Sequence, residues 1–252
     1  MTDPPKALVT EIAEITHDEF RLESSLEKVE VVVPEPIDRL TPEFGAWLRA
    51  AVVYEAKVLA RNPSSEPDEE GLRPLSQFRL RVLFWERPDG EFTIWLAYPV
   101  SAAAINNIKP VQPELLMAIW RELGVLKVQR SSHIGAGMRL LFPVKESTPD
   151  DAFDLYKALE EDELDEGLVF RKFPFSRATR IAEAHSGAIV AICDGQIFFM
   201  YGDYDEFDRL QIKFARTGSF HTAKSADVKS LDDFVNLIGK RQLQWLKNGK
   251  SK

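Results

Sequence analysis

The amino-acid sequence predicts an α+β fold, in which mostly antiparallel sheets are built from β-hairpins with flanking helices. Two hairpins carry this prediction, each with an Asp-Gly pair between apolar runs: 77–98 around Asp89-Gly90, and 188–201 around Asp194-Gly195. An Asp-Gly pair is a strong hairpin signal because both turn residues must tolerate positive φ. Helical patterns do not alternate strictly with strands, which disfavours a doubly wound parallel sheet.

Composition sets limits on the class of protein. The 252 residues are 44% hydrophobic and 29% charged, as in an ordinary globular protein, and the formal net charge is −8. This acidic balance argues against wrapping a polyanion with the whole surface, but it leaves room for a local basic face. The single cysteine, Cys193, excludes an internal disulfide framework. No signal-peptide pattern opens the chain, so we expect a soluble cytoplasmic protein.

The first part of the chain mixes an ambiguous segment with two clearer ones. Residues 7–20 fit strand and helix periods equally well. The run 26–33 is expected to be a strand that is stopped by a proline. A helix is predicted over 42–60, with Thr41 as its N-cap and proline at its first position, because apolar residues then recur at near-helical spacing.

The middle of the chain is predicted to run from loop to hairpin to helix. Residues 62–73 are rich in proline, serine and acidic residues and indicate a solvated loop before the first hairpin. A short amphipathic helix over 113–123 should end at Gly124. Two strands, at 125–130 and 138–144, are expected around a glycine-containing turn.

The C-terminal part is predicted to contain three helices around the second hairpin. One helix starts at Thr148-Pro149, a shorter one covers 176–184, and the last begins at Ser230 with a capping-box pattern. A strand is expected at 210–215. We predict an N-terminal α+β lobe at 1–146 and a C-terminal α+β lobe at 147–252, with a single domain as the alternative.

One glycine-containing loop is the first candidate binding site. Arg130, His133 and Arg139 surround the run 131–137, which also holds two serines and two glycines. Such a loop can contact an anion through its cations and backbone amides. A dinucleotide fingerprint needs a third glycine and a following helix, and both are missing here. A plain connection between strands is therefore the favoured interpretation of the loop itself.

A second candidate site is the basic-aromatic segment 170–180. Its four cations alternate with three phenylalanines: Arg171, Lys172, Arg177 and Arg180 are the cations. Arginines bind phosphates and aromatic rings stack on bases, so this pattern is the best indication of nucleic-acid binding in the chain. The same alternation also describes a strand with one buried face, and that structural interpretation is favoured.

No catalytic set, metal site or cofactor site is predicted. No two histidines lie at metal-ligand spacing, and the lone cysteine has no partner. Glu55-Ala56-Lys57 resembles the Glu-x-Lys end of a metal-dependent nuclease motif, with Asp38 and Glu43 as upstream acids. A helix would place Glu55 and Lys57 on different faces, so the motif needs residues 51–60 to form a strand instead.

These observations favour a non-enzymatic cytoplasmic protein that binds a macromolecular partner, most simply another protein. The alternative is a nucleic-acid-binding protein, associated with a nuclease, of a bacterial defence or mobile-element system. That alternative predicts that the six cations Arg130, Arg139, Arg171, Lys172, Arg177 and Arg180 share one face. No membrane association is expected, a homo-oligomer is left open, and an enzyme with scattered site residues is the third alternative.

Overall fold

The computed structural model describes residues 3–15, 20–61, 75–106, 113–130, 139–140, 179–183, 189–193, 196–202, 210–214 and 230–248. The described helices are α1 (Lys6–Ile15), α2 (Glu35–Leu40), α3 (Pro42–Arg49), α4 (Ala102–Asn106), α5 (Glu114–Glu122) and α8 (Leu231–Asn248). The strands of the N-terminal half are β1 (Phe20–Leu22), β2 (Glu27–Val29), β3 (Val52–Arg61), β4 (Leu75–Glu86), β5 (Phe92–Tyr98) and β6 (Val125–Arg130). The remaining strands are β7 (Arg139–Leu140), β8 (Thr179–Glu183), β9 (Ile189–Cys193), β10 (Gln196–Gly202) and β11 (Leu210–Phe214).

The described strands join one hydrogen-bonded sheet in the order β1-β3-β4-β5-β6-β7-β8-β9-β10-β11, and β2 also pairs with β3. Every pairing in this sheet is antiparallel. The predicted α+β class with a mostly antiparallel sheet is therefore confirmed. The sheet includes strands on both sides of residue 146, and the division into two lobes stays a prediction.

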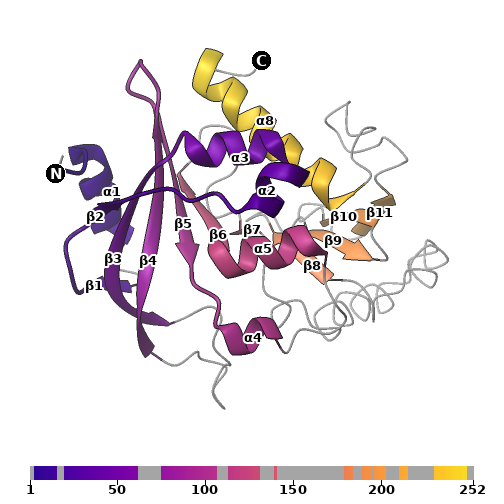
Figure 1. The fold of residues 1–252 in the computed structure, drawn as a ribbon, viewed down its shortest axis with the longest axis horizontal. Coiled ribbons are helices and arrows are strands. Elements are labelled where there is room, and N and C mark those ends of the chain that lie inside the picture. Colours follow the sequence, from indigo (N-terminus) through magenta and orange to yellow (C-terminus); the bar gives the residue numbers. More distant parts are fainter. Residues whose placement is uncertain are drawn as a thin grey trace.

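Helices cover the two faces of the sheet unequally (Figure 1). On one face, α2, α3, α5 and α8 enclose a core that contains all five tryptophans of the chain. The indole rings of Trp47 and Trp85 stack with centroids 4.1 Å apart, and Trp95 meets Trp47 edge-on at 4.6 Å. On the opposite face, Leu8 and Ile12 of α1 join a second core. The strands between the two cores are consequently apolar on both sides.

The predicted helix over 42–60 is wrong in its second half, because α3 ends at Arg49 and β3 begins at Val52. Tyr54 and Val58 enter the core beside α1, whereas Val53 enters the tryptophan core. Burial on both faces produces a dense apolar pattern that imitates helical spacing. Long antiparallel pairing with β4 overrides that local pattern.

The turn between α2 and α3 also differs from its predicted chemistry. Thr41 stands at the N-cap position of α3 but makes no side-chain capping hydrogen bond there. Its buried hydroxyl instead donates to the carbonyl oxygen of Ile37, at 2.8 Å. The same carbonyl also accepts the backbone N–H of Thr41 at 2.9 Å, so the hydroxyl adds a second hydrogen bond at the end of α2.

Two further segments depart from the prediction. The shorter helix expected over 176–184 is wrong: Thr179–Glu183 is β8, which pairs with β7 and β9. The strand expected over 26–33 is shortened to Glu27–Val29. Outside the described residues lie the helix that starts at Pro149, the turn Asp194-Gly195 and the part of the 138–144 strand beyond Leu140.

Several elements match their predictions closely. The first hairpin pairs β4 with β5 around a turn in which Gly90 has a φ of +84°. Helix α5 ends before Gly124, which has a φ of +81°. Ser230 and Asp233 exchange backbone-to-side-chain hydrogen bonds at the start of α8, as in the predicted capping box.

Candidate binding site

Of the seven residues predicted for the two binding sites, Arg130 is the one whose side chain the structure describes. Its Nη1 donates to Oε2 of Glu11 in α1 at 2.7 Å, and its guanidinium lies 4.2 Å from the ring centroid of Phe92. Glu11 is mostly buried, whereas about half of Arg130 is exposed. Arg130 therefore helps to hold α1 against the sheet, a structural role that the sequence did not indicate.

The other predicted site residues are placed only in part. The backbone register places Arg139 opposite Lys127 of β6 and Glu183 of β8. It places Arg180 opposite Ala191 of β9. His133, Arg171, Lys172 and Arg177 lie outside the described residues. That the six cations share one face accordingly stays a prediction.

A different group of polar side chains is fully described, on the exposed end of the two longest strands. We call it the exposed β3–β4 face and define it by Glu55, Lys57, Leu75, Gln77, Arg79 and Arg81. It arises from strand alternation, because Leu80 and Val82 of β4 enter the core beside α1 and their neighbours along the strand point away from it. Arg81 marks its boundary with the helices, since its Nη1 donates to the carbonyl oxygen of Glu122 in α5 at 2.7 Å.

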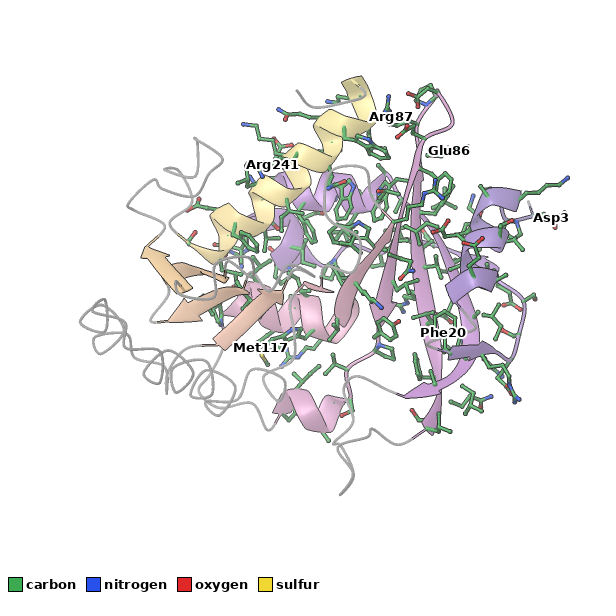
Figure 2. All side chains as sticks on the ribbon, turned by 180° about the vertical axis from the view of Figure 1, so that it is seen from behind. Asp3, Phe20, Glu86, Arg87, Met117 and Arg241 are labelled. Atoms are coloured by element: carbon green, nitrogen blue, oxygen red, sulfur yellow. The ribbon has the colours of Figure 1, made fainter. Side chains whose placement is uncertain are left out.

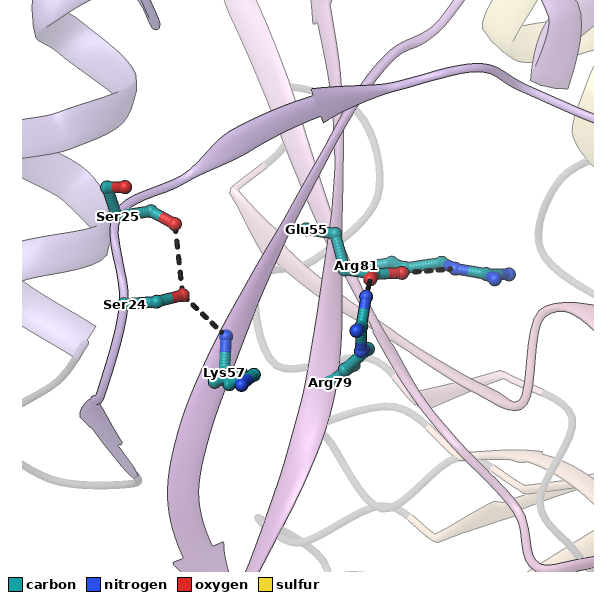
Figure 3. Close-up of polar contacts among 6 residues, drawn as sticks. All are labelled: Ser24, Ser25, Glu55, Lys57, Arg79 and Arg81. Atoms are coloured by element: carbon teal, nitrogen blue, oxygen red, sulfur yellow. Dashed lines mark hydrogen bonds and ion pairs between the residues drawn. The ribbon is translucent and has the colours of Figure 1, made fainter.

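Glu55 is the anionic centre of this face (Figure 3). Its Oε1 accepts from Nη1 of Arg79 at 2.6 Å, and its Oε2 accepts from Nε of Arg81 at 3.3 Å. The Glu55 side chain is 14% exposed, against 70% for Arg79 and 47% for Arg81. Burial alone would raise the pKa of Glu55, but the two arginines outweigh burial and lower it. Glu55 is thus a fixed, ionised carboxylate at neutral pH.

Ser24 holds the neighbouring part of β3 in place. Both β1 and β2 pair with β3, and the connection between them leaves Lys57 without a strand partner for its amide. The backbone N–H of Lys57 donates instead to the Ser24 hydroxyl oxygen at 3.0 Å (Figure 3). The Glu23 N–H donates to the Lys57 carbonyl oxygen at 2.7 Å. The Ser24 side chain replaces a missing ladder bond and keeps Lys57 in extended geometry.

The Glu-x-Lys motif requires a strand and carboxylates that are free to bind a metal ion. The structure provides the strand but pairs the carboxylates of Glu55 and Asp38 with arginines. Residues 52–61 do form a strand, so Glu55 and Lys57 share a face. Both oxygens of Glu55 are bound by arginines, however, and the upstream Asp38 is bound by Arg49. No group of three or more metal-binding side chains occurs within the part of the chain that the structure describes. The arrangement of the described side chains favours ion pairing over metal binding.

Sequence reasoning missed Arg79 and Arg81, although the signal was present. The run Gln77-Phe78-Arg79-Leu80-Arg81-Val82 alternates polar and apolar residues. Such a pattern predicts one exposed face with two cations two residues apart. The three cations are not close together in the sequence, because Lys57 comes from the partner strand. A search for cations that cluster along the chain therefore does not find them.

Among the described helices, none combines the length and the apolar character that crossing a membrane requires. Comparison of the chain with protein-family models, curated proteins and solved structures returns no match, so the functional argument depends on the described side chains themselves.

Proposed function

We propose that this chain is a non-enzymatic cytoplasmic protein that binds a protein partner through the exposed β3–β4 face. The observation that supports this proposal is that three cations and an exposed leucine lie together on one pair of strands. Leu75 is 64% exposed, and it lies on the same side of β4 as Arg79 and Arg81. Arginine is enriched at protein interfaces, and a large exposed apolar side chain beside it adds contact area.

Fixed geometry supports this proposal. Glu55 orients Arg79 through one guanidinium nitrogen. The other two guanidinium nitrogens of Arg79 have no hydrogen-bond partner within the described residues. A prearranged arginine loses less side-chain entropy when it binds than a freely rotating one does. The same face thus combines exposed donors with a rigid strand platform, which suits recognition.

The alternative, a nucleic-acid-binding protein of a defence or mobile-element system, uses the same cations. Lys57, Arg79 and Arg81 would contact phosphates. Single-stranded nucleic acid is also bound by aromatic rings that stack on bases, and Phe78 packs instead with the core on the opposite face. A gel-shift titration across salt tests this alternative, because phosphate contacts produce a steep loss of affinity as salt rises.

Site-specific photo-crosslinking tests the proposal. A photo-reactive residue replaces Gln77, which is exposed on this face, and a matched control replaces Glu91, which is exposed in the hairpin turn. In the cells that express the chain, we expect a protein adduct at position 77 that Arg79→Glu removes, and no such adduct at position 91. Adducts with nucleic acid alone, or no protein adduct at position 77, would contradict the proposal.

A further inference from the structure

We infer that the partner segment recognised by the exposed β3–β4 face is an extended acidic segment that also carries an apolar side chain. This inference rests on the proposed function and specifies what the face binds. One carboxylate of the segment lies between Lys57 and Arg79, and one apolar side chain lies on Leu75.

The position of the carboxylate follows from a like-charge pair. Lys57 and Arg79 are direct cross-strand partners in the β3–β4 register. Directly opposed side chains lie about 5 Å apart at Cβ, where like charges destabilise the pairing. Glu55 neutralises Arg79 from one side, and no ion pair of Lys57 is recorded within the described residues. A carboxylate from a partner would relieve this repulsion and bond to both cations.

The surrounding charges permit one such carboxylate. Glu27 lies opposite Glu55 in β2 and interacts electrostatically with Arg79. The local charges are thus three cations and two carboxylates, which leaves a small positive excess. That excess fits a segment with few acidic residues better than a long polyanion.

The position of the apolar side chain follows from Leu75. Leu75 precedes Arg79 by four residues on the same strand face, a separation of about 13 Å at the rise of a β-strand. An extended partner segment would therefore carry its apolar residue about four positions from its acidic residue. A helix would need about nine residues to span the same distance. An extended segment spans this distance with fewer residues than a helix does, and its rise per residue matches that of β4. We therefore expect the partner segment to be extended.

Chemical-shift titration of the full chain with peptides at millimolar concentration tests the inference, since two such contacts give only weak binding. The probe is a glycine-serine peptide with one glutamate and one leucine four positions apart. We expect it to bind about twofold to fivefold more tightly than peptides with glutamate changed to glutamine or leucine changed to serine, since each lost exposed contact is worth about 0.4–1 kcal/mol. Moving leucine next to glutamate should weaken binding similarly.

Matched variants of the chain assign the contacts. Lys57→Gln should reduce the preference for glutamate, because only Arg79 then remains to bind the carboxylate, and it should leave the preference for leucine unchanged. Leu75→Ser should remove the preference for leucine and leave the preference for glutamate unchanged. Arg241→Gln, at an exposed arginine of α8, serves as the control and should leave binding unchanged. Thermal unfolding of each variant verifies that the fold is retained.

The outcomes separate this inference from the function on which it depends. Equal binding of all peptides, no measurable binding, or unaltered preferences in the two variants would overturn the inference. If crosslinking at position 77 still captures a protein, the face remains a protein-binding surface with another kind of segment. If that crosslink is also missing, both proposals fail.

Discussion

Gln242 is fully buried in α8, and neither polar atom of its amide has a hydrogen-bond partner among the residues that the structure describes. The buried indole nitrogens of Trp47 and Trp95 likewise lack a hydrogen-bond partner within the described part of the chain. A buried amide with no partner costs about 1–3 kcal/mol of stability relative to an apolar residue. Most buried polar groups in proteins form hydrogen bonds, so Gln242 is an exception. An apolar residue should be more stable at this position.

The first prediction concerns this residue. Gln242→Leu should raise the free energy of unfolding by about 1–3 kcal/mol, because the apolar side chain no longer buries an unsatisfied amide. Urea denaturation measures the change. Gln244→Leu is the matched control, since Gln244 is exposed on the same helix and should change stability little. Destabilisation by Gln242→Leu would show that the amide does have a partner in solution.

The second prediction concerns pH and Glu55. Its pKa is lowered in the folded chain, so its charge stabilises the fold above the unfolded pKa of about 4.3, and this contribution is lost as pH falls through the folded pKa. Glu55→Gln should cost about 1 kcal/mol at neutral pH, a small value because both arginines are largely exposed. The difference between the two proteins should shrink in acid, which urea denaturation at several pH values can measure.

Glu91→Gln provides the comparison for that experiment, because Glu91 is an exposed turn residue. It should leave stability nearly unchanged at neutral pH. A Glu55→Gln difference that persists undiminished below the folded pKa would contradict the assigned role of the charge.

At the scale of elements, α3 and α8 approach each other through Gly239. A Cβ built at Gly239 would lie 2.3 Å from the backbone nitrogen of Phe44, closer than any real contact. Beside it, the backbone N–H of Glu43 donates to the side-chain oxygen of Asn236 at 2.9 Å. Glycine at this position lowers the helix propensity of α8 but allows the two helix backbones to pack closely.

The third prediction follows from that contact. Alanine normally stabilises a helix interior by about 1 kcal/mol relative to glycine. Gly239→Ala should instead lower the free energy of unfolding by about 1–3 kcal/mol, because it forces α3 and α8 apart. Thermal unfolding compares it with Lys240→Ala, at the adjacent exposed position. A stabilised Gly239→Ala variant would disprove the close approach.

The fourth prediction tests the cap of α8. Ser230→Ala removes the hydroxyl that accepts from the Asp233 N–H at 3.2 Å. It should lower stability by about 1 kcal/mol, as is usual for the loss of an N-cap. Ser230→Asp retains an acceptor and should restore most of the loss, whereas equal loss in both variants would argue against a capping role.

Elements with local chemical signals were predictable from the sequence, and elements fixed by distant contacts were not. Ser230 marks the start of a helix through its capping hydroxyl, and Gly90 and Gly124 mark turns through their positive φ. The segment 52–61 shows no such marker, and its partner strand, β4, determines its conformation. Arg79 and Arg81 form a site with Glu55 only through that same pairing, which a linear search for clustered charges does not reveal.

At the scale of the whole molecule, the C-terminal helix completes a core built largely from the N-terminal half. Phe234, Val235 and Trp245 of α8 are buried in the cluster that contains Phe44 and Trp47. Figure 2 shows Arg87, in the first hairpin, beside α8, and its guanidinium lies 5.4 Å from the centroid of the Trp245 ring. The C-terminal helix therefore shares one packing unit with α3 and the first hairpin.

The fifth prediction follows from this packing. Because α8 shares its core with α3 and the central strands, amides of α8 and β4 should exchange with solvent at similar free energies of opening. Native-state hydrogen exchange measures both sets. Exchange in α8 at markedly lower free energy than in β4 would show that the helix opens on its own.

The interrupted strand beside β3 has a consequence for how copies of this chain behave in a crowded solution. A continuous outer strand would offer a long row of unpaired amides and carbonyls to another molecule. Here that border is divided between β1 and β2, each three residues long, and the connection that contains Ser24 separates them. Exposed Arg21, Glu27 and Lys28 also lie along it. The break should therefore hinder the growth of ordered fibrils from this side of the sheet.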